Sequence, residues 1–297
     1  MKINYDNQHE KWEECIKDKN RNKFSQNWLR RDTLDYWRHQ RMLRPLDAFI
    51  LKGETWLTIG DGRYGTEANH LIRKGANAHA SDLSEQLLKV SKNKGFINEY
   101  SKQNAENLQF SDDSFDYVLI KEALHHCPRP WIALHEAFRV CKKGVILIEP
   151  NDQLSGKFNV IKFLIFIVKK FLKKKINFKD YNFEEVGNFI FTINLREIEK
   201  FMLSMHYRKL AFIKMNDYYI KGVEEINLNP INFKGKKKKY FLKLILKLKD
   251  FFSNLRLAEC SIILVALFKE DPSKDTIEKL KINNWNLIKL PKNPFRK

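Results

Sequence analysis

The sequence predicts an α/β protein built on a doubly wound, mostly parallel sheet of seven strands. Three observations favour this fold class. Apolar runs typical of buried strands alternate with amphipathic, helix-like stretches from Thr55 to Pro150. The first strand ends in a glycine-rich turn, and an acidic residue ends the second. The chain has 297 residues, 43% of them hydrophobic, so it can bury a large core, and global disorder is excluded.

The first elements follow each other as strand, helix, strand and helix. An amino-terminal segment, residues 1–50, is aromatic, basic and helix-like. A strand is expected at 55–60, and a helix at 66–74, which Gly75 closes. A second strand is expected at 76–82, and a second helix at 84–95. Such a strand–turn–helix–strand unit implies a right-handed crossover between parallel strands.

The same alternation continues to Pro150. A strand is expected at 115–121, an amphipathic helix at 130–144 and another strand at 145–150. Their continuous apolar character suits strands that helices cover on both faces. These elements extend the parallel sheet.

Beyond Pro150 the pattern is looser, and we expect it to add a helical insertion and the last two strands. We expect the amino-terminal segment, residues 1–50, to form a helical lid over the main domain at 51–270. A tail at 271–297 is expected to lie extended over the surface. The expected elements of the later part are a basic insertion at 152–192 with a Lys-rich helix at 157–175, a helix at 194–206, a strand at 207–215, a Lys-rich helix at 236–252 and a strand at 260–268, the two strands forming an antiparallel edge pair.

The glycine-rich turn and the acid after it predict a site for an adenosine-containing cofactor. Gly60, Gly62 and Gly65 follow the first strand directly and open a helix, and glycines allow the backbone to approach a ligand closely. Asp82 ends the next strand, where a carboxylate can accept hydrogen bonds from both ribose hydroxyls. The structural alternative is a tight turn followed by a capping aspartate. This pattern alone does not separate a nicotinamide dinucleotide from S-adenosylmethionine.

Three further segments make that distinction. Residues 104–116 (NAENLQFSDDSFD), 121–126 (KEALHH) and 135–150 (HEAFRVCKKGVILIEP) occur in this order. Together they resemble the motifs around the third to fifth strands of class I, Rossmann-like S-adenosylmethionine-dependent methyltransferases. The resemblance covers roughly residues 53–151, about a third of the chain, and is silent on the methyl acceptor. It disfavours a nicotinamide-dependent oxidoreductase, for which no hydride-transfer site is evident.

The resemblance implies S-adenosyl-L-methionine as the cofactor. It places the glycines against the methionine end and ribose, Asp82 at the ribose hydroxyls, Asn104 at the adenine edge, and Lys121 and Glu122 beside the methionine portion and the acceptor. The implied cofactor-binding residues are Gly60, Asp61, Gly62, Gly65, Asp82, Leu83, Asn104, Ala105, Glu106, Lys121 and Glu122.

Two positions depart from the family's pattern. Thr58 stands where the family often has an acid that orients the methionine amino group, and Asp61 replaces a small residue between the first two glycines. The amino group would then fall to Asp61 or Glu122. These departures keep an alternative open, namely a catalytically degenerate relative that serves as a peripheral membrane binding module.

His125 and His126 are the candidate catalytic bases, with a slight preference for His126. Methyl transfer is an in-line displacement that depends mainly on alignment, but a hydroxyl acceptor also has to lose a proton, and histidine suits that role. The alternative is that one ring packs under the loop while the other faces solvent. Glu149 lies at the end of the fifth strand, with Asn151 and Asp152 beside it, at the edge where ligands bind in such sheets; these are substrate-contact or turn residues.

The formal charge of +19 points to anionic partners or to a Lys-rich background composition. In both Lys-rich helices, apolar residues lie beside lysines, as in helices on anionic bilayers, although a core-facing helix with a solvated charged face gives a similar pattern. Nucleic acid is disfavoured because no binding motif is recognisable. We expect a small-molecule, sugar or lipid-linked acceptor, most simply methylated on oxygen. The oligomeric state is not predicted.

We expect a cytoplasmic protein, with association at the inner membrane surface as the alternative that the Lys-rich helices leave open. Its four cysteines are scattered without metal-ligand spacing, so neither a disulfide framework nor a metal site is expected. The amino terminus lacks the apolar stretch of a secretion signal. No apolar run approaches the roughly 20 residues of a membrane-spanning helix.

Overall fold

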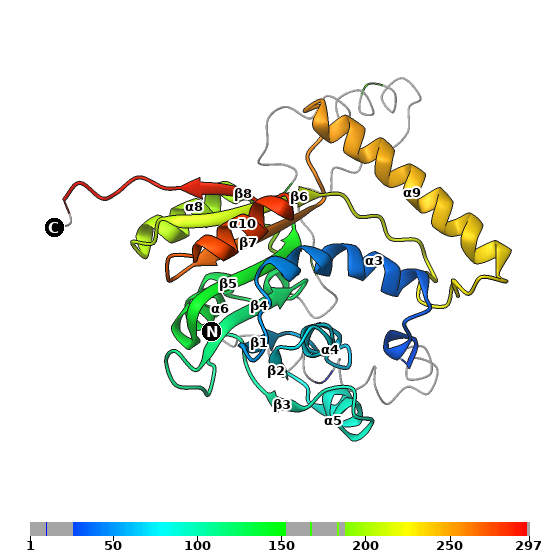
Figure 1. Ribbon diagram of the computed structural model, residues 1–297, viewed down its shortest axis with the longest axis horizontal. Helices are drawn as coiled ribbons and strands as arrows, with labels where there is room; N and C mark the ends of the chain where they lie inside the picture. Colours follow the sequence, from blue (N-terminus) through cyan, green and yellow to red (C-terminus); the bar gives the residue numbers. More distant parts are fainter. Residues whose placement is uncertain (1–9, 11–25, 153–166, 168–182, 184–187, 296–297) are drawn as a thin grey trace.

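A computed structural model describes residue 10 and residues 26–152, 167, 183 and 188–295. Its centre is an eight-stranded sheet with the order β3-β2-β1-β4-β5-β7-β6-β8 (Figure 1). The strands are β1 Thr55–Ile59, β2 Asn77–Asp82, β3 Glu99–Lys102, β4 Phe115–Lys121, β5 Cys141–Pro150, β6 Lys209–Met215, β7 Ile262–Phe268 and β8 Asn286–Lys289.

Strands β1 to β5 are mutually parallel, and β7, β6 and β8 add antiparallel pairings. In register, Leu57 of β1 lies between His79 of β2 and Val118 of β4. The predicted α/β class with a mostly parallel sheet is therefore confirmed. The antiparallel pair formed by β7 and β6 also occurs as expected, but it does not end the sheet.

The predicted number of seven strands is wrong because the tail supplies an eighth. Residues expected to lie extended over the surface instead form helix α10 (Lys274–Ile282) and strand β8, which pairs with β6. The buried Trp285 precedes β8, and its indole Nε1 donates to the carbonyl of Pro45 at 3.1 Å. One buried aromatic residue thus fixes a segment whose neighbours are polar.

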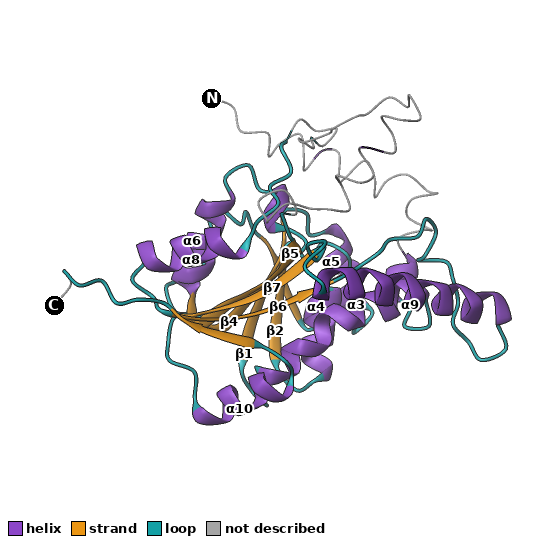
Figure 2. Cartoon of the chain, turned by 90° about the horizontal axis from the view of Figure 1, so that it is seen from above, coloured by secondary structure: helices purple, strands orange, loops and turns teal. Residues whose placement is uncertain are grey.

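Helices lie on both sides of the sheet, which gives three layers (Figure 2). One face packs against η2, α4, α5 and α10, and the other against α6 and α8. Successive β1 residues alternate between the two sides, since Trp56 joins the first cluster and Leu57 the second. The helices are η1 Gln26–Leu29, α3 Leu34–Leu43, η2 Arg44–Ala48, α4 Thr66–Arg73, α5 Gln86–Asn93, η3 Leu124–His126, α6 Pro130–Val140, α8 Leu195–Ser204, α9 Phe233–Asn254 and α10.

Local sequence accounts for several helix boundaries. Thr33 caps α3 by accepting from the Tyr36 N–H, and Asn194 forms a capping box with Glu197 at the start of α8. The helix expected at 130–144 ends earlier, at Val140, because β5 begins at Cys141. Gly144 already lies in that strand, where a Cβ would clash with the backbone of β7.

Several expected features lie outside the described residues. They include all but one residue of the Lys-rich helix at 157–175, most of the insertion at 152–192 and about half of the amino-terminal segment. Helix α9 covers the second expected Lys-rich helix. In the described part of the chain, no helix is long and apolar enough to cross a membrane.

Candidate cofactor site and active site

The predicted site residues lie at one edge of the sheet. Strands β1, β2, β4 and β5 are parallel, so their carboxyl ends meet there. The chain leaves β1 toward β2 on one side and returns to β4 on the other, which makes this edge the topological switch point where doubly wound sheets bind ligands. This edge holds the glycine turn, which comes directly after β1, and the residues Asp82, Lys121 and Glu149 at the ends of β2, β4 and β5.

The glycine turn is tightly enclosed. Gly60 has a φ of +75°, and Gly65 has a φ of +67°, a region that favours glycine. Gly62 has no such dihedral constraint, but a Cβ on it would lie 2.7 Å from Asp82 Oδ2. The backbone of the turn therefore lies directly against the carboxylate that ends β2.

Asp82 has the environment of a ligand-binding carboxylate. Its Oδ1 accepts from the Ser84 N–H at 2.8 Å, and burial raises its pKa to about 6 despite the nearby N–H groups of Gly62 and Leu83. The buried Ser84 hydroxyl has no hydrogen-bond partner in the described structure. A carboxylate, an unpartnered hydroxyl and a close backbone turn fit the ribose of an adenosine cofactor.

Asp61 points into the protein. Its carboxylate accepts from the Thr58 hydroxyl at 2.9 Å and from the N–H groups of Glu67 and Ala68 at 3.2 and 2.8 Å. Burial, together with the neighbouring Glu67, raises the pKa of Asp61 well above its usual range. Thr58 and Asp61, the two residues that depart from the family's pattern, therefore pair with each other. The Asp61 carboxylate also holds the glycine turn to the start of α4.

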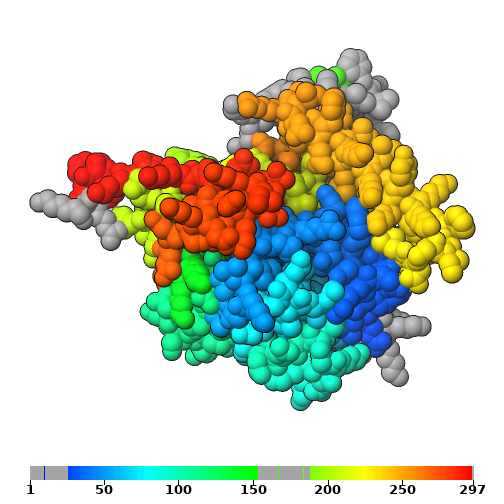
Figure 3. Space-filling model, viewed as in Figure 1, coloured from blue at the N-terminus to red at the C-terminus, as the bar shows by residue number. Residues whose placement is uncertain are grey.

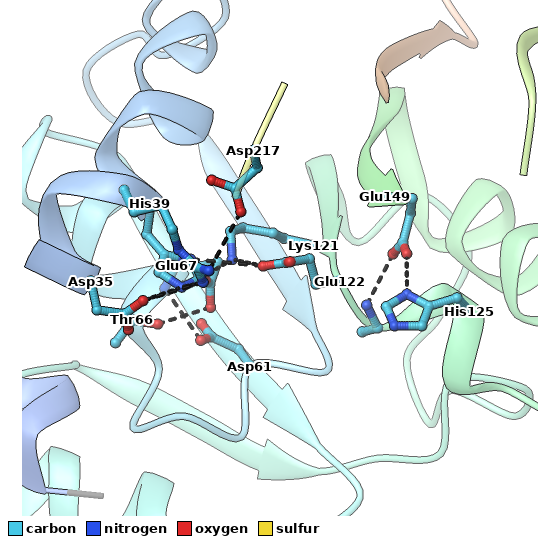
Figure 4. A network of polar contacts seen from close by, with 12 residues as sticks. Asp35, His39, Asp61, Thr66, Glu67, Lys121, Glu122, His125, Glu149 and Asp217 are labelled. Carbon is cyan, nitrogen blue, oxygen red and sulfur yellow. Dashed lines mark hydrogen bonds and ion pairs between the residues drawn. The ribbon is translucent and has the colours of Figure 1, made fainter. Parts of the chain in front are cut away.

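Lys121 lies between two carboxylates at the end of β4 (Figure 4). Its Nζ is 2.9 Å from Glu122 Oε2 and 3.2 Å from Glu67 Oε1, and its side chain is 4% exposed. Burial raises the pKa of Glu67, but the Lys121 ammonium, the hydrogen bond with Asp61 and the nearby His39 together outweigh this effect and bring the pKa to about 2. Burial also raises the pKa of Glu122, but the same ammonium, together with His39 and Arg38, holds this pKa below its usual range.

Glu122 is the better placed of the two residues proposed for the methionine amino group. It adopts a left-handed backbone, with a φ of +49°, and its side chain is 30% exposed, whereas Asp61 is fully engaged. Strained backbone of this kind is common at functional sites.

Helix α3 supplies site residues that the sequence did not identify. His39 Nδ1 is 3.8 Å from Glu122 Oε2, and Arg38 bridges Asp35 and Asp217 at 3.2 and 3.4 Å. Burial, together with Lys121, lowers the pKa of His39. Asp217 follows β6, about 180 residues away in sequence, and no local pattern connects it to α3. The predicted amino-terminal segment thus reaches the edge of the site.

The residues that the resemblance places at the adenine edge form a compact turn. Asn104 Oδ1 accepts from the Glu106 N–H at 2.9 Å, and Ala105 is half-buried between them. The Glu106 side chain accepts from the backbone and the guanidinium of Arg129, both at 2.6 Å. Asn104 therefore keeps a position at the carboxyl edge, whereas the Glu106 carboxylate ties this turn to the loop before α6.

His125 and Glu149 form a buried pair on the other side of the edge (Figure 4). His125 Nδ1 lies 2.6 Å from Glu149 Oε2, and Glu149 Oε1 accepts from the N–H groups of Ala123 and Leu124. Glu149 is fully buried, so it orients the ring of His125 and shapes the loop. The ring of His126 lies 3.9 Å from that of His125, measured between centroids.

Comparison with known proteins matches the part of the chain that holds most of the candidate cofactor-binding residues. Residues 57–148 match the family model described as a methyltransferase domain. A ubiquinone/menaquinone biosynthesis C-methyltransferase (UbiE) of Bartonella bacilliformis is 40% identical over 91 residues, which are 29% of this chain and 35% of the relative. A demethylmenaquinone methyltransferase of Clavibacter sepedonicus is 36% identical over 95 residues, 31% of this chain and 38% of the relative. The chain thus spans little more than a third of these relatives' length.

Solved structures with a similar outline include the YcgJ protein of Bacillus subtilis, at 17% identity and a TM-score of 0.48, over 79% of this chain and 100% of that one. A methyltransferase of Archaeoglobus fulgidus has 13% identity and a TM-score of 0.48, over 78% of this chain and 94% of that one. The fold class itself follows from this chain's own strand order.

Proposed function

We propose that this chain, whose residues 57–148 form a class I, Rossmann-like methyltransferase domain, transfers the methyl group of S-adenosylmethionine to a small-molecule acceptor. The observation that carries the proposal is the close contact between Gly62 and Asp82 at the switch point of the sheet. S-adenosylmethionine is the cofactor of this class of domain. When bound, it supplies an electrophilic methyl group on a sulfonium.

The described residues fit this cofactor at three places. Asp82 would accept from the ribose hydroxyls, with Ser84 beside it, and Asn104 would lie at the adenine edge. Glu122 would bind the methionine amino group. It would thereby take the role of the acid that many family members have at the position of Thr58. Lys121 would hold Glu122 in place through its 2.9 Å contact.

The acceptor is proposed to lose a proton, and His125 is proposed to take it. Glu149 fixes the ring through Nδ1, which leaves Nε2 on the opposite side of the imidazole as the basic nitrogen. The geometry thus favours His125 over His126, the residue that the sequence slightly favoured. A proton is lost from an oxygen acceptor and also from a carbon acceptor, and the relative of Bartonella bacilliformis is described as a C-methyltransferase of ubiquinone/menaquinone biosynthesis. The acceptor class therefore includes oxygen and carbon atoms of small molecules, sugars and lipid-linked precursors.

Calorimetric titration with S-adenosylhomocysteine tests the proposal, with Asp82→Ala and NADH as controls. Micromolar binding that the substitution weakens, without binding of NADH, is the expected result. A folded protein that binds neither ligand would instead support the alternative of a degenerate binding module, in which the turn and Asp61 have only a structural role.

An acceptor screen then tests the base. With an acceptor in hand, His125→Ala is expected to lower kcat by about 10²- to 10⁴-fold while the affinity for S-adenosylhomocysteine stays unchanged. His126→Ala is the matched control, because the two rings are adjacent. A larger effect from His126→Ala would reverse the assignment.

A further inference from the structure

Helix α9 turns apolar side chains toward solvent. Phe233 is 81% exposed, Tyr240 72% and Phe251 56%, and Leu244 and Leu248 are each about half exposed. We call these five residues the outer stripe. Single exposed apolar residues are common in proteins, but a row of large ones along one helix marks an interaction surface.

The outer stripe lies opposite the face by which α9 packs on the protein. Gly235, Leu242 and Leu246 are buried, and the two leucines join a cluster with Leu34 of α3. Phe233, Tyr240 and Leu244 each precede one of these buried residues by two positions. Two residues of an α-helix are about 200° apart around its axis, so the stripe faces away from the protein.

Lysines flank the outer stripe. The helix contains eight lysines and one acidic residue, Asp250. Exposed Lys236, Lys243 and Lys247 each follow a stripe residue by three positions, so they are its neighbours on the helix surface. Figure 3 shows α9, in yellow and orange, at the rim of the molecule, where it forms an edge of the described surface.

We propose that α9 docks on an anionic lipid surface, with the outer stripe at the headgroup boundary and the flanking lysines on the headgroups. An apolar stripe bordered by cations is the arrangement of interfacial helices. A second copy of this chain is disfavoured as the occupant, because it would bring a second row of lysines against the first. The net charge of +19 acts in the same direction as the helix and attracts the whole molecule to an anionic surface.

Docking through α9 would also place the candidate site close to the membrane. The ammonium groups of Lys239 and Lys243 lie 5.3 and 5.9 Å from the Trp37 ring of α3, the helix that carries His39 to Glu122. The proposal does not depend on methyl transfer, since the stripe lies outside the cofactor site. If the enzyme docks in this way, the membrane itself could supply a lipid-linked acceptor.

Flotation of the full chain with vesicles tests the proposal. Vesicles of phosphatidylglycerol and phosphatidylcholine in equal parts are expected to carry the protein upward at low salt, and vesicles of phosphatidylcholine alone are not. Leu248→Gln, and separately Lys236→Gln/Lys243→Gln/Lys247→Gln, should reduce the floating fraction to the level seen with phosphatidylcholine. Added salt should release the protein because it screens the lysines.

Matched controls separate docking from general effects of charge and hydrophobicity. Ile282→Gln removes an apolar residue of α10 that is more exposed than Leu248, and Lys274→Gln/Lys281→Gln/Lys289→Gln removes the same charge from α10 and β8; both should float like the parent. Failure to float with anionic vesicles, or flotation unaffected by Leu248→Gln, would overturn the proposal. So would a dimer, seen by light scattering, that Leu248→Gln dissociates. S-adenosylhomocysteine titration should be the same for all variants, so the two proposals can fail separately.

Discussion

Gly62 and Asp82 are in direct contact across two strand ends: a Cβ on residue 62 would lie 2.7 Å from Asp82 Oδ2 and 2.8 Å from its Cγ. The turn and the carboxylate therefore form one unit, and a change in either should be felt at the proposed ribose site. This relationship supplies two of the predictions.

Gly62→Ala should weaken binding of S-adenosylhomocysteine by about tenfold or more, equivalent to about 1.4 kcal/mol, because the new methyl group displaces the Asp82 carboxylate. Folding should be largely kept, since Gly62 does not have a positive φ. Gly53→Asn is the matched control: Gly53 has a φ of +85° with open space around it, and asparagine tolerates that region. Calorimetry measures both. Equal affinities of Gly62→Ala and the parent would contradict a site at this turn.

The raised pKa of Asp82 predicts a pH dependence of both stability and binding. Its carboxyl group titrates at about 6 in the folded protein and near 3.8 when unfolded, so the folded state holds the proton more tightly. Its contribution to stability is present below about pH 4 and is lost as the pH rises through 6, by up to about 3 kcal/mol. Urea unfolding of the parent and Asp82→Asn should therefore diverge across this window, with the variant relatively more stable at pH 7.

Ligand binding should move in the opposite direction, because ribose hydroxyls need the ionised carboxylate as an acceptor. The affinity of the parent for S-adenosylhomocysteine should rise as the pH increases through about 6, and Asp82→Asn should bind weakly without this step. A parent titration that is flat between pH 5 and pH 8 would contradict the assignment.

The two ion pairs of Lys121, with Glu67 and with Glu122, lead to a third prediction. Lys121→Met leaves Glu67 and Glu122 without their cation, and breaking a buried ion pair on one side typically costs about 3–5 kcal/mol. Lys121→Met/Glu67→Gln should recover much of that loss, since it removes one unpaired charge. Chemical denaturation at pH 7 measures both variants. An unchanged stability of Lys121→Met would mean that the two carboxylates find other partners.

Glu67 itself predicts the behaviour in acid. Its pKa is about 2 in the folded protein and 4.5 when unfolded, so its stabilising contribution is present above pH 4.5 and is lost as the pH falls toward 2. The parent should lose stability over this range more steeply than Glu67→Gln.

Sequence patterns predicted the sheet well because its central strands are continuous apolar runs. β4 matches the expected 115–121. Short, ordered motifs single out the glycine turn, Asp82 and Asn104, and the structure places all three at the carboxyl edge of the sheet. The prediction of a helix over 130–144 is too long at its end, because residues 141–144 are equally compatible with a strand and form the start of β5. The positions of candidate residues that stand in local motifs can therefore be predicted from the sequence.

The rest of the site depends on contacts between segments that are distant in sequence. His39 approaches Glu122 from α3, and Asp217 approaches Arg38 from the loop after β6. Neither pairing leaves a periodic or motif signal. Glu67 offered one weak sign, an acid in the first turn of α4, which the helix dipole explains equally well.

Glu149 makes a prediction about the loop that carries His125. It accepts from two backbone N–H groups and from the imidazole while fully buried, so Glu149→Ala leaves three donors unpaired. The free energy of unfolding should fall by about 3 kcal/mol or more. Glu149→Gln retains an acceptor oxygen and should lose about half as much. If both variants are as stable as the parent, the pair is not part of the folded framework.

The carboxyl-terminal strand provides the last prediction. Removing residues 284–297 deletes β8, exposes the edge of β6 and empties the place of Trp285, which packs against Phe49 at 5.1 Å between ring centroids. Loss of a large buried aromatic side chain alone costs about 3–5 kcal/mol, and the uncovered strand edge favours aggregation. Trp285→Ala should therefore reproduce most of the loss in thermal stability, whereas deletion of 293–297, beyond the buried Leu290, should leave the melting temperature unchanged. A truncated protein that melts like the parent would show that the eighth strand is an accessory to a sheet that is complete with seven.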